Sequence, residues 1–238
     1  MSGLEVRAGY EPYGANAVFD ADGEILGIVW SNAPNKVSLG EGAWIGPKDV
    51  FWNRAKFVWR SSAVVGVTLA DHLVGVHLLL SNAAVTATRE KLPVAHPIRR
   101  LMTPFTYYTV TINRGSIATL LSRNSMLHRA VGLTWNGLKA GFLFASSHVE
   151  FGTATEQIEA RGMLDAPEWL YPWGADIQRY DAIVHKFVRA YVTTYMTDVH
   201  VHADADRRAW DDGLHEFSNR LLPRVTDVDS LVSVLSNI

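Results

Sequence analysis

Two histidines and an aspartate stand within the longest apolar stretch of the chain, residues 63–80. Asp71 and His72 are adjacent, and His77 follows five residues after His72. Imidazole and carboxylate groups transfer protons and bind metal ions, so this stretch is the first candidate for chemistry. On a regular α-helix, a spacing of five residues separates two side chains by about 140°. A π-bulge would bring His72 and His77 onto one face, and such bulges cluster at functional sites.

The adjacent pair Asp71 and His72 has two competing interpretations. The two side chains would serve as an acid and a base if they reached the same substrate. On a regular helix, however, neighbouring side chains point apart, so two separate hydrogen-bonding groups are an equally good interpretation. The dipeptide His96-Pro97 is assigned to a structural turn, because proline fixes the backbone there.

A second group of candidate ligands alternates along the chain at His200, His202, Asp204 and Asp206. If this segment is extended, all four side chains face one way. The alternative is a surface loop in which the histidines are solvated and the aspartates cap a helix. We favour the loop.

Composition limits the classes of protein to which the chain can belong. It has 238 residues, 48% of them hydrophobic, which is enough to bury a sizeable core. The net charge of −2 comes from scattered residues and predicts no binding to nucleic acid. With no cysteine, the chain has neither disulfides nor thiolate metal sites. No Ser-His-Asp arrangement, phosphate loop or nucleotide fingerprint is present.

The apolar stretch 63–80 has about the length of a membrane span. Ionisable groups are costly inside lipid, and this stretch contains three of them. We therefore expect a buried central helix rather than a transmembrane one. Residues 1–10 lack a basic region followed by an apolar run, so we expect no signal peptide and a cytoplasmic location.

Local patterns near the N-terminus predict a small β-hairpin followed by a long helix. Val18–Trp30 reads as two short strands around the turn signal Asp22-Gly23. Residues 31–46 are rich in Gly, Asn and Ser and are expected to form a loop. Pro47 suits the first turn of the central helix, which should continue to about Asn82.

The rest of the chain predicts further helices and no alternation of strands with helices. They are expected at 107–122, 155–164, 175–196 and 206–221, with a last one opened by Thr226 and Asp229. The segment 175–196 is the most amphipathic, and one face carries Ile177, Tyr180, Val184, Phe187, Tyr191 and Tyr195. We therefore expect a mainly α, single domain over 1–238, with a hairpin and loop at 1–46 and a helical body at 47–238.

Short motifs follow one another in a fixed order along the chain. They are Trp52-Asn-Arg-Ala55-Lys56, Arg60-Ser61-Ser62, Asp71-His72, Arg89-Glu-Lys-Leu92, His96-Pro97-Ile98, Thr109-Val-Thr-Ile112-Asn113, Tyr171-Pro172 to Asp176, Tyr191-Val-Thr-Thr-Tyr195 with Asp198, and Asp227-Val-Asp-Ser-Leu231. Their types and order resemble the catalytic domain of the lipoxygenases. That domain is much longer, so the chain matches an inner portion of it. The resemblance implies a helical domain built around a long central helix.

In lipoxygenases, two histidines of the central helix hold a non-haem iron, together with late ligands that include the C-terminal isoleucine carboxylate. Counted from Ala55-Lys56, the first iron histidine of the family falls on Val67 and the second on His72. His77 matches a third family histidine that is not a ligand. A valine side chain cannot coordinate a metal, so this register implies that one ligand of the helix pair is lost.

The late ligands are also not found in this register. The family's late histidine and asparagine would follow Ile238, so we interpret the terminal isoleucine as a coincidence. A non-haem iron site usually needs about three protein ligands. We therefore expect no cofactor. The alternative is non-haem iron in a rebuilt site that uses His72 and His77, with Asp71 and a distant group such as His185.

The resemblance also assigns residues to a substrate pocket. Ser116 matches the small residue that steers where oxygen attacks, and Leu120 matches a pocket leucine. Ile117 replaces a commonly seen arginine, which makes this wall more apolar and argues against an ordinary fatty acid as substrate. With Val67 and Thr68, these residues are expected to line an elongated apolar pocket.

Three functions are weighed on this basis. The first is a metal-free biosynthetic enzyme that binds a polyene or other lipid-like molecule and controls its cyclisation or isomerisation, with Asp71, His72 and His77 as catalytic groups. The second is a lipoxygenase-type dioxygenase of unsaturated lipids with a rebuilt iron site. The third is a non-catalytic lipid-binding module or one half of a split enzyme. In that case a second copy or another chain would cover an exposed apolar stripe on the last helix.

Overall fold

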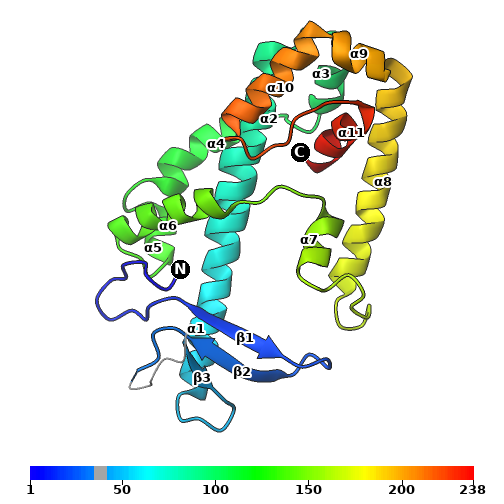
Figure 1. Ribbon diagram of the computed structural model, residues 1–238. Coiled ribbons are helices and arrows are strands. Elements are labelled where there is room, and N and C mark those ends of the chain that lie inside the picture. The colour runs from blue at the N-terminus through cyan, green and yellow to red at the C-terminus, as the bar shows by residue number, and fades with distance from the viewer. Residues whose placement is uncertain (35–41) are drawn as a thin grey trace. The chain divides into compact units, whose positions relative to one another are not determined.

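The computed structural model describes residues 1–34 and 42–238 and is mainly helical, with one small sheet near the N-terminus (Figure 1). The strands are β1 (Ala15–Phe19), β2 (Ile25–Trp30) and β3 (Ala43–Ile45). The helices are α1 (Trp52–Val65), the π-helix η1 (Gly66–Ser81), α2 (Asn82–Lys91), α3 (Pro97–Met102), α4 (Thr109–Ser116), the π-helix η2 (Ile117–Leu121), α5 (Met126–Ala130), α6 (Trp135–His148), α7 (Ala154–Ala160), α8 (Pro172–Tyr195), α9 (Asp198–Ala203), α10 (Ala205–Phe217) and α11 (Val228–Asn237).

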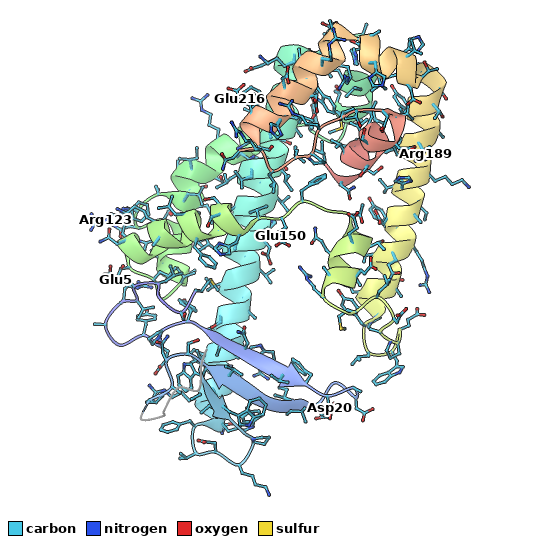
Figure 2. All side chains as sticks on the ribbon, viewed as in Figure 1. Glu5, Asp20, Arg123, Glu150, Arg189 and Glu216 are labelled. Carbon is cyan, nitrogen blue, oxygen red and sulfur yellow. The ribbon has the colours of Figure 1, made fainter. Side chains whose placement is uncertain are left out.

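The predicted hairpin is confirmed and gains a third strand. β1 and β2 pair antiparallel with Ala15 opposite Trp30, and β3 pairs with the other edge of β2. At the hairpin tip, the Asp20 carboxylate accepts hydrogen bonds from the backbone N–H groups of Asp22 and Glu24 (Figure 2). β3 lies in the segment predicted as loop, residues 31–46, of which 35–41 fall outside the described residues. Three residues are too short a run to show the two-residue period of a strand.

One face of the sheet packs on the start of the long helix. The side chains of Ile28, Trp30 and Ile45 are fully buried against Ala55 and Val58 of α1. The helix begins at Trp52 and not at Pro47, because the Asp49 carboxylate accepts the Phe51 N–H and closes a turn ahead of it. On the other face, the ring of Trp44 covers Gly27 so closely that an added Cβ would lie 2.1 Å from it. Any larger residue at this position would require the Trp44 ring to move.

The long central helix is confirmed as the continuous run α1, η1 and α2. Its middle, η1, is a π-helix over sixteen residues. π-helices occur mostly as single-turn bulges, so a run of this length is unusual. The side chains of Leu69, Leu73 and Val74 are buried, whereas Asp71 and His72 are exposed.

By length and composition alone, the helix Trp52–Lys91 could cross a membrane, and 28% of its most apolar window is buried. No other described helix meets these two criteria. Core helices of globular proteins meet them as well. That the chain is not transmembrane therefore stays a prediction.

The chain forms two compact units. Unit 1 comprises residues 1–76 and 112–149, and unit 2 comprises residues 77–111 and 150–238. Unit 1 holds the sheet, α1, α5 and α6, and most of η1. Unit 2 holds α2, α3 and α7 to α11. The boundary between the units falls within η1, between Val76 and His77.

Unit 2 is organised around two buried residues of α10. The Trp210 indole Nε1 donates to Thr88 Oγ1 of α2 at 3.1 Å. The Arg207 guanidinium donates to the carbonyl oxygens of Val201 and Val225, both at 2.9 Å. The apolar residues of α11 complete this core: Leu231, Val232, Val234 and Leu235. The apolar face of the last helix is therefore covered within unit 2, and whether another chain binds there stays a prediction.

Two details of unit 2 differ from the sequence predictions. On α8, Val184 and Tyr191 pack on the core as predicted, but Tyr180 and Phe187 are 63% and 54% exposed. Helix α8 packs on the core through a narrower stripe of residues that includes Val188, so part of its apolar face remains exposed. The segment predicted as a loop at 200–206 contains the helix α9 and the start of α10.

The turn at His96 is confirmed, and the structure shows how it is fixed. The His96 imidazole accepts the backbone N–H of Ile98 on Nδ1 at 3.2 Å and so caps α3. Its Nε2 lies 2.9 Å from Asp204 Oδ2. The other oxygen of Asp204 accepts the backbone N–H of Arg207 and caps α10, which confirms the predicted capping role. One pair of side chains therefore fixes the starts of two helices.

This pair should make unit 2 sensitive to acid. Partial burial raises the pKa of the Asp204 carboxyl, but hydrogen bonds from the Arg207 N–H and from His96 outweigh it, so the pKa lies below its ordinary value of 3.8. Because its pKa is lowered in the folded state, the ionised Asp204 carboxylate stabilises the fold at pH values above the ordinary pKa of 3.8. This stabilisation is lost as the pH falls through the pKa of the folded state. Asp204→Asn keeps a capping oxygen, whereas Asp204→Ala removes it and should cost about 1 kcal/mol more.

The measurement is urea unfolding of wild type and both variants at pH 7 and pH 3. The stability difference between wild type and Asp204→Asn should shrink at pH 3. The difference between Asp204→Asn and Asp204→Ala should remain, because it comes from capping. An equal wild-type advantage over Asp204→Asn at both pH values would show that the ion pair does not contribute.

Candidate functional site

The π-helical geometry of η1 determines which side chains face the same way near the predicted site. In a π-helix the backbone hydrogen bonds join residues five apart, so side chains at this spacing fall close to one face. Val67 and His72 have this spacing within unit 1. At this spacing, the position that the resemblance gives to the first metal ligand carries an aliphatic side chain. Val67 is 59% exposed, and His72 is exposed.

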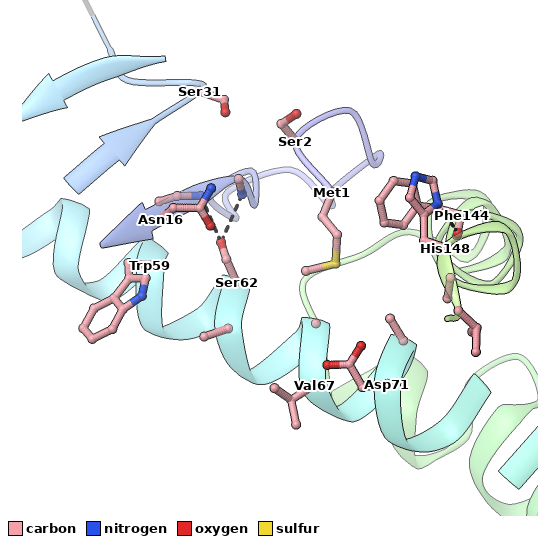
Figure 3. Close-up of a pocket in the computed structure, with 17 residues that line it drawn as sticks. Met1, Ser2, Asn16, Ser31, Trp59, Ser62, Val67, Asp71, Phe144 and His148 are labelled. Atoms are coloured by element: carbon pink, nitrogen blue, oxygen red, sulfur yellow. Dashed lines mark hydrogen bonds between the residues drawn. The ribbon is translucent and has the colours of Figure 1, made fainter. Parts of the chain in front are cut away.

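A groove of about 460 Å³ runs beside this helix within unit 1 (Figure 3). We call it the first groove. Its lining comes from the N-terminal segment, β1, α1, η1 and α6, and includes Asn16, Trp59, Val67, Asp71, Phe144 and His148. Small residues of α1 and η1, namely Ala63, Gly66 and Ala70, leave space along the helix. The groove thus combines apolar and aromatic side chains with a comparable share of polar surface.

The polar groups of the first groove differ in how firmly they are held. The His148 ring stacks on Phe144 with centroids 4.0 Å apart. Its Nδ1 lies 2.8 Å from the Phe144 carbonyl oxygen and 3.0 Å from the Ser147 hydroxyl oxygen, and Nε2 has no hydrogen-bond partner among the described residues. Within the described part of the chain, the side chains of Asp71 and Asn16 make no hydrogen bond or ion pair.

A buried serine fixes one end of the first groove. The Ser62 hydroxyl donates to the Val58 carbonyl at 2.8 Å. It accepts the backbone N–H of Gly14 at 3.0 Å and that of Ala15 at 3.4 Å. These bonds tie the start of β1 to α1 (Figure 3). The serine of the family-like Arg60-Ser61-Ser62 motif is therefore structural here.

A second groove of about 390 Å³ lies along another side of the same helix in unit 1. It is mostly apolar and is lined by Tyr13, Phe57, Val64, Thr68, Leu127 and Val131, with Arg60 among its polar residues. Val67 and Thr68 were predicted to line one pocket. As neighbours on a helix they point apart, and the structure assigns them to different grooves.

The other three residues predicted for the pocket lie on α4 and η2. Ser116 is half-buried, and its hydroxyl donates to the Asn113 carbonyl at 2.8 Å. Ile117 is 59% exposed, and Leu120 is half-buried. None of the three lines either groove described above. Their contact with a substrate stays a prediction.

The predicted catalytic residues are not brought together as one cluster. Asp71 lines the first groove, whereas His72 is not part of its lining. His77 is half-buried and belongs to unit 2. Among residues 1–34 and 42–238, no three His, Asp or Glu side chains are close enough to hold one metal ion. The donor set does not fit the iron that the fold family implies, because Val67 offers no donor at the first position.

Sequence reasoning missed His148 and Asn16. Neither belongs to a motif, and each is far from Asp71 along the chain. Their approach to Asp71 depends on how α6 and β1 pack on the long helix. The one available signal was the apolar run Phe142 to Phe144 ahead of His148, which predicts a packed helix but no groove.

A family model described as lipoxygenase matches residues 33–139. The mouse hydroperoxide isomerase ALOXE3 is 29% identical over 162 residues, which cover 67% of this chain and 22% of that protein. The mouse polyunsaturated fatty acid lipoxygenase ALOX12 is 27% identical over 201 residues, which cover 80% of this chain and 29% of that protein. The chain thus spans less than a third of the length of these relatives.

Solved structures show the same fold. The crystal structure of a lipoxygenase variant superposes with a TM-score of 0.83 at 18% identity and covers 99% of this chain and 39% of that one. The manganese lipoxygenase of Gaeumannomyces graminis superposes with a TM-score of 0.75 at 16% identity and covers 98% of this chain and 43% of that one. The predicted lipoxygenase-like helical fold is therefore confirmed.

If the first groove is the binding site, a bulky residue at Val67 should block it. We expect Val67→Trp to weaken binding of the neutral apolar dye Nile red roughly ten-fold, since overfilling a packed site costs about 1–3 kcal/mol. Thr68→Trp is the matched control, because it places the same ring in the second groove. Fluorescence titration measures both. Loss of binding in Thr68→Trp alone would assign the apolar site to the second groove instead.

Proposed function

Because this chain is a divergent relative of the lipoxygenase family, we propose that it is an enzyme that binds a lipid-like or polyene substrate in the first groove and isomerises or cyclises it without the family's iron. The observation that carries the proposal is the position of Val67. The motif resemblance places this residue at the register of the first iron ligand, and its side chain lines the groove. An aliphatic side chain there adds apolar surface in place of a donor.

The composition of the groove supports binding of a lipid-like molecule. Val67, Trp59 and Phe144 offer apolar and aromatic surface to a hydrocarbon chain, whose burial contributes about 25 cal/mol per Å². Holding a flexible chain in a reactive shape lowers the entropic part of a cyclisation barrier. The carboxylate of Asp71 supplies a proton-transfer group beside that chain.

The names of the relatives are consistent with more than one reaction. ALOXE3 is named a hydroperoxide isomerase and ALOX12 a polyunsaturated fatty acid lipoxygenase. Isomerisation adds no atoms to the substrate, so it is compatible with a groove that offers acid–base groups. We favour it for this chain over oxygen insertion. A cytoplasmic location remains part of the proposal.

A dioxygenase with a rebuilt iron site is the second candidate. It is supported by His72, which the motif resemblance places at the register of the second family ligand, and by the π-helical assignment of Gly66–Ser81. It requires at least two further donors on a face where Val67 supplies none.

Iron content separates the two candidates. Protein expressed in iron-supplemented medium and analysed by mass spectrometry of metals should carry far less than one iron per chain. His72→Ala should leave that value unchanged. About one iron per chain, lost in His72→Ala, would reject the metal-free proposal and establish the dioxygenase alternative.

A further inference from the structure

The second groove of unit 1 has features that the proposed function does not use. Its lining shares no residue with that of the first groove. Most of its surface is apolar, and Arg60 is the one charged residue in its lining as far as the described part of the chain extends. Small-molecule sites combine apolar walls with a few polar groups that fix the orientation of the ligand. The second groove therefore has the composition of a site for an amphipathic anion.

One wall of the second groove is a single face of the long helix. Phe57, Arg60 and Val64 follow one another on α1 at spacings of three and four residues, and all three line the groove. Side chains at these spacings are neighbours on a helix, with Cβ atoms about 5–6 Å apart. The helix therefore places a guanidinium group directly beside an apolar surface.

The Arg60 guanidinium is available to a ligand. It makes no hydrogen bond or ion pair with any other residue of 1–34 and 42–238, and its Cζ lies 5.9 Å from the centre of the Trp59 ring. Arg54 on the same helix, in contrast, is paired with Glu11. A guanidinium is always charged in proteins, so its role does not depend on titration. Its planar fork of N–H donors matches the two oxygens of a carboxylate.

The other wall of the second groove is fixed by the N-terminal segment. It is formed mainly by Tyr13, Leu127 and Val131. The Tyr13 hydroxyl accepts the backbone N–H of Gly132 at 2.8 Å, and the Arg7 guanidinium donates to the Val131 carbonyl oxygen. Arg7 thus adds a second positive charge at this wall, and no carboxylate among the described residues lines the groove to oppose it.

We propose that the second groove is a separate binding site for a molecule with one short hydrocarbon chain and one carboxylate end. Arg60 binds the carboxylate, and the chain lies over Phe57, Val64 and Thr68. A volume of about 390 Å³ is near the lower end of the range of about 300–1,000 Å³ for small-molecule sites, so it suits one short chain rather than a two-chain lipid. The inference does not rest on the proposed function, which assigns the substrate to the first groove.

The test compares octanoate with 1-octanol, which has the same chain without the charge. Ligand-observed NMR titration at pH 7 gives a dissociation constant for each. Arg60→Met keeps an apolar stem and removes the charge, so octanoate should bind about ten-fold more weakly, whereas the affinity for 1-octanol should stay unchanged. Thr68→Trp fills the second groove and should weaken octanoate binding by a similar factor. Val67→Trp should leave octanoate binding unchanged, because Val67 lines the first groove.

Arg123→Met is the matched control for removal of a positive charge. Arg123 is exposed in unit 1 and does not line the second groove, so octanoate binding should stay unchanged in this variant. An unchanged octanoate affinity in Arg60→Met, or an equal loss in Arg60→Met and Arg123→Met, would overturn the inference. If Thr68→Trp lowers the melting temperature, Val64→Trp replaces it, since Val64 is 64% exposed on the same wall.

Failure of this inference is distinguishable from failure of the proposed function. If Val67→Trp loses Nile red binding but Thr68→Trp binds octanoate as wild type does, the second site is rejected and the first groove remains the apolar site. If the protein carries one iron per chain, the metal-free function is rejected whatever the octanoate titrations give.

Discussion

In the π-helix η1 the backbone hydrogen bonds join residues five apart, and this spacing determines which side chains line the groove beside the long helix. A regular α-helix would turn Val67 and His72 about 140° apart. Over Gly66–Ser81 the π-helical period brings them to one face instead. A π-helix is wider than an α-helix, its hydrogen bonds are less favourable, and it is rarely long. A π-helix of sixteen residues therefore requires support from the packing of its side chains. Leu69, Leu73 and Val74 are the buried residues that give it.

That support comes from a stripe of buried side chains along α1 and η1, which also separates the two grooves from each other. Ala55, Val58, Ser62 and Val65 are the buried residues of α1, and Leu69 continues the stripe into η1. Side chains flanking the stripe on one side line the first groove, and those on the other side line the second. The hydroxyl of Ser62 links this stripe to β1. A change within the stripe would alter both grooves, whereas Val67 and Thr68 each affect one.

The fold was largely predictable because its signals are local or shared with a large family. Asp22-Gly23 marks the hairpin, and the ordered motifs from Trp52 to Asp198 identify the helical body. The short elements were not predictable. Helix α3 begins at Pro97, shortly after Pro93, and α9 lies where alternating histidines and aspartates suggested a loop. Both are held by contacts that are distant in sequence, such as His96 with Asp204. The site was half predictable: Val67 and Asp71 follow from the register, but Asn16 and His148 depend on packing.

The valine that the motif resemblance places at the register of a metal donor has different consequences for fold and for chemistry. The fold tolerates it, because the long helix is held by its own backbone bonds and by the buried stripe rather than by a ligand at Val67. The proposed chemistry follows from it, because a site that removes hydrogen atoms or activates oxygen needs a centre that accepts electrons, and imidazole and carboxylate groups do not accept them. What such side chains do well is move protons. The proposed function therefore assigns to the first groove reactions in which bonds shift and the oxidation state of the substrate is conserved.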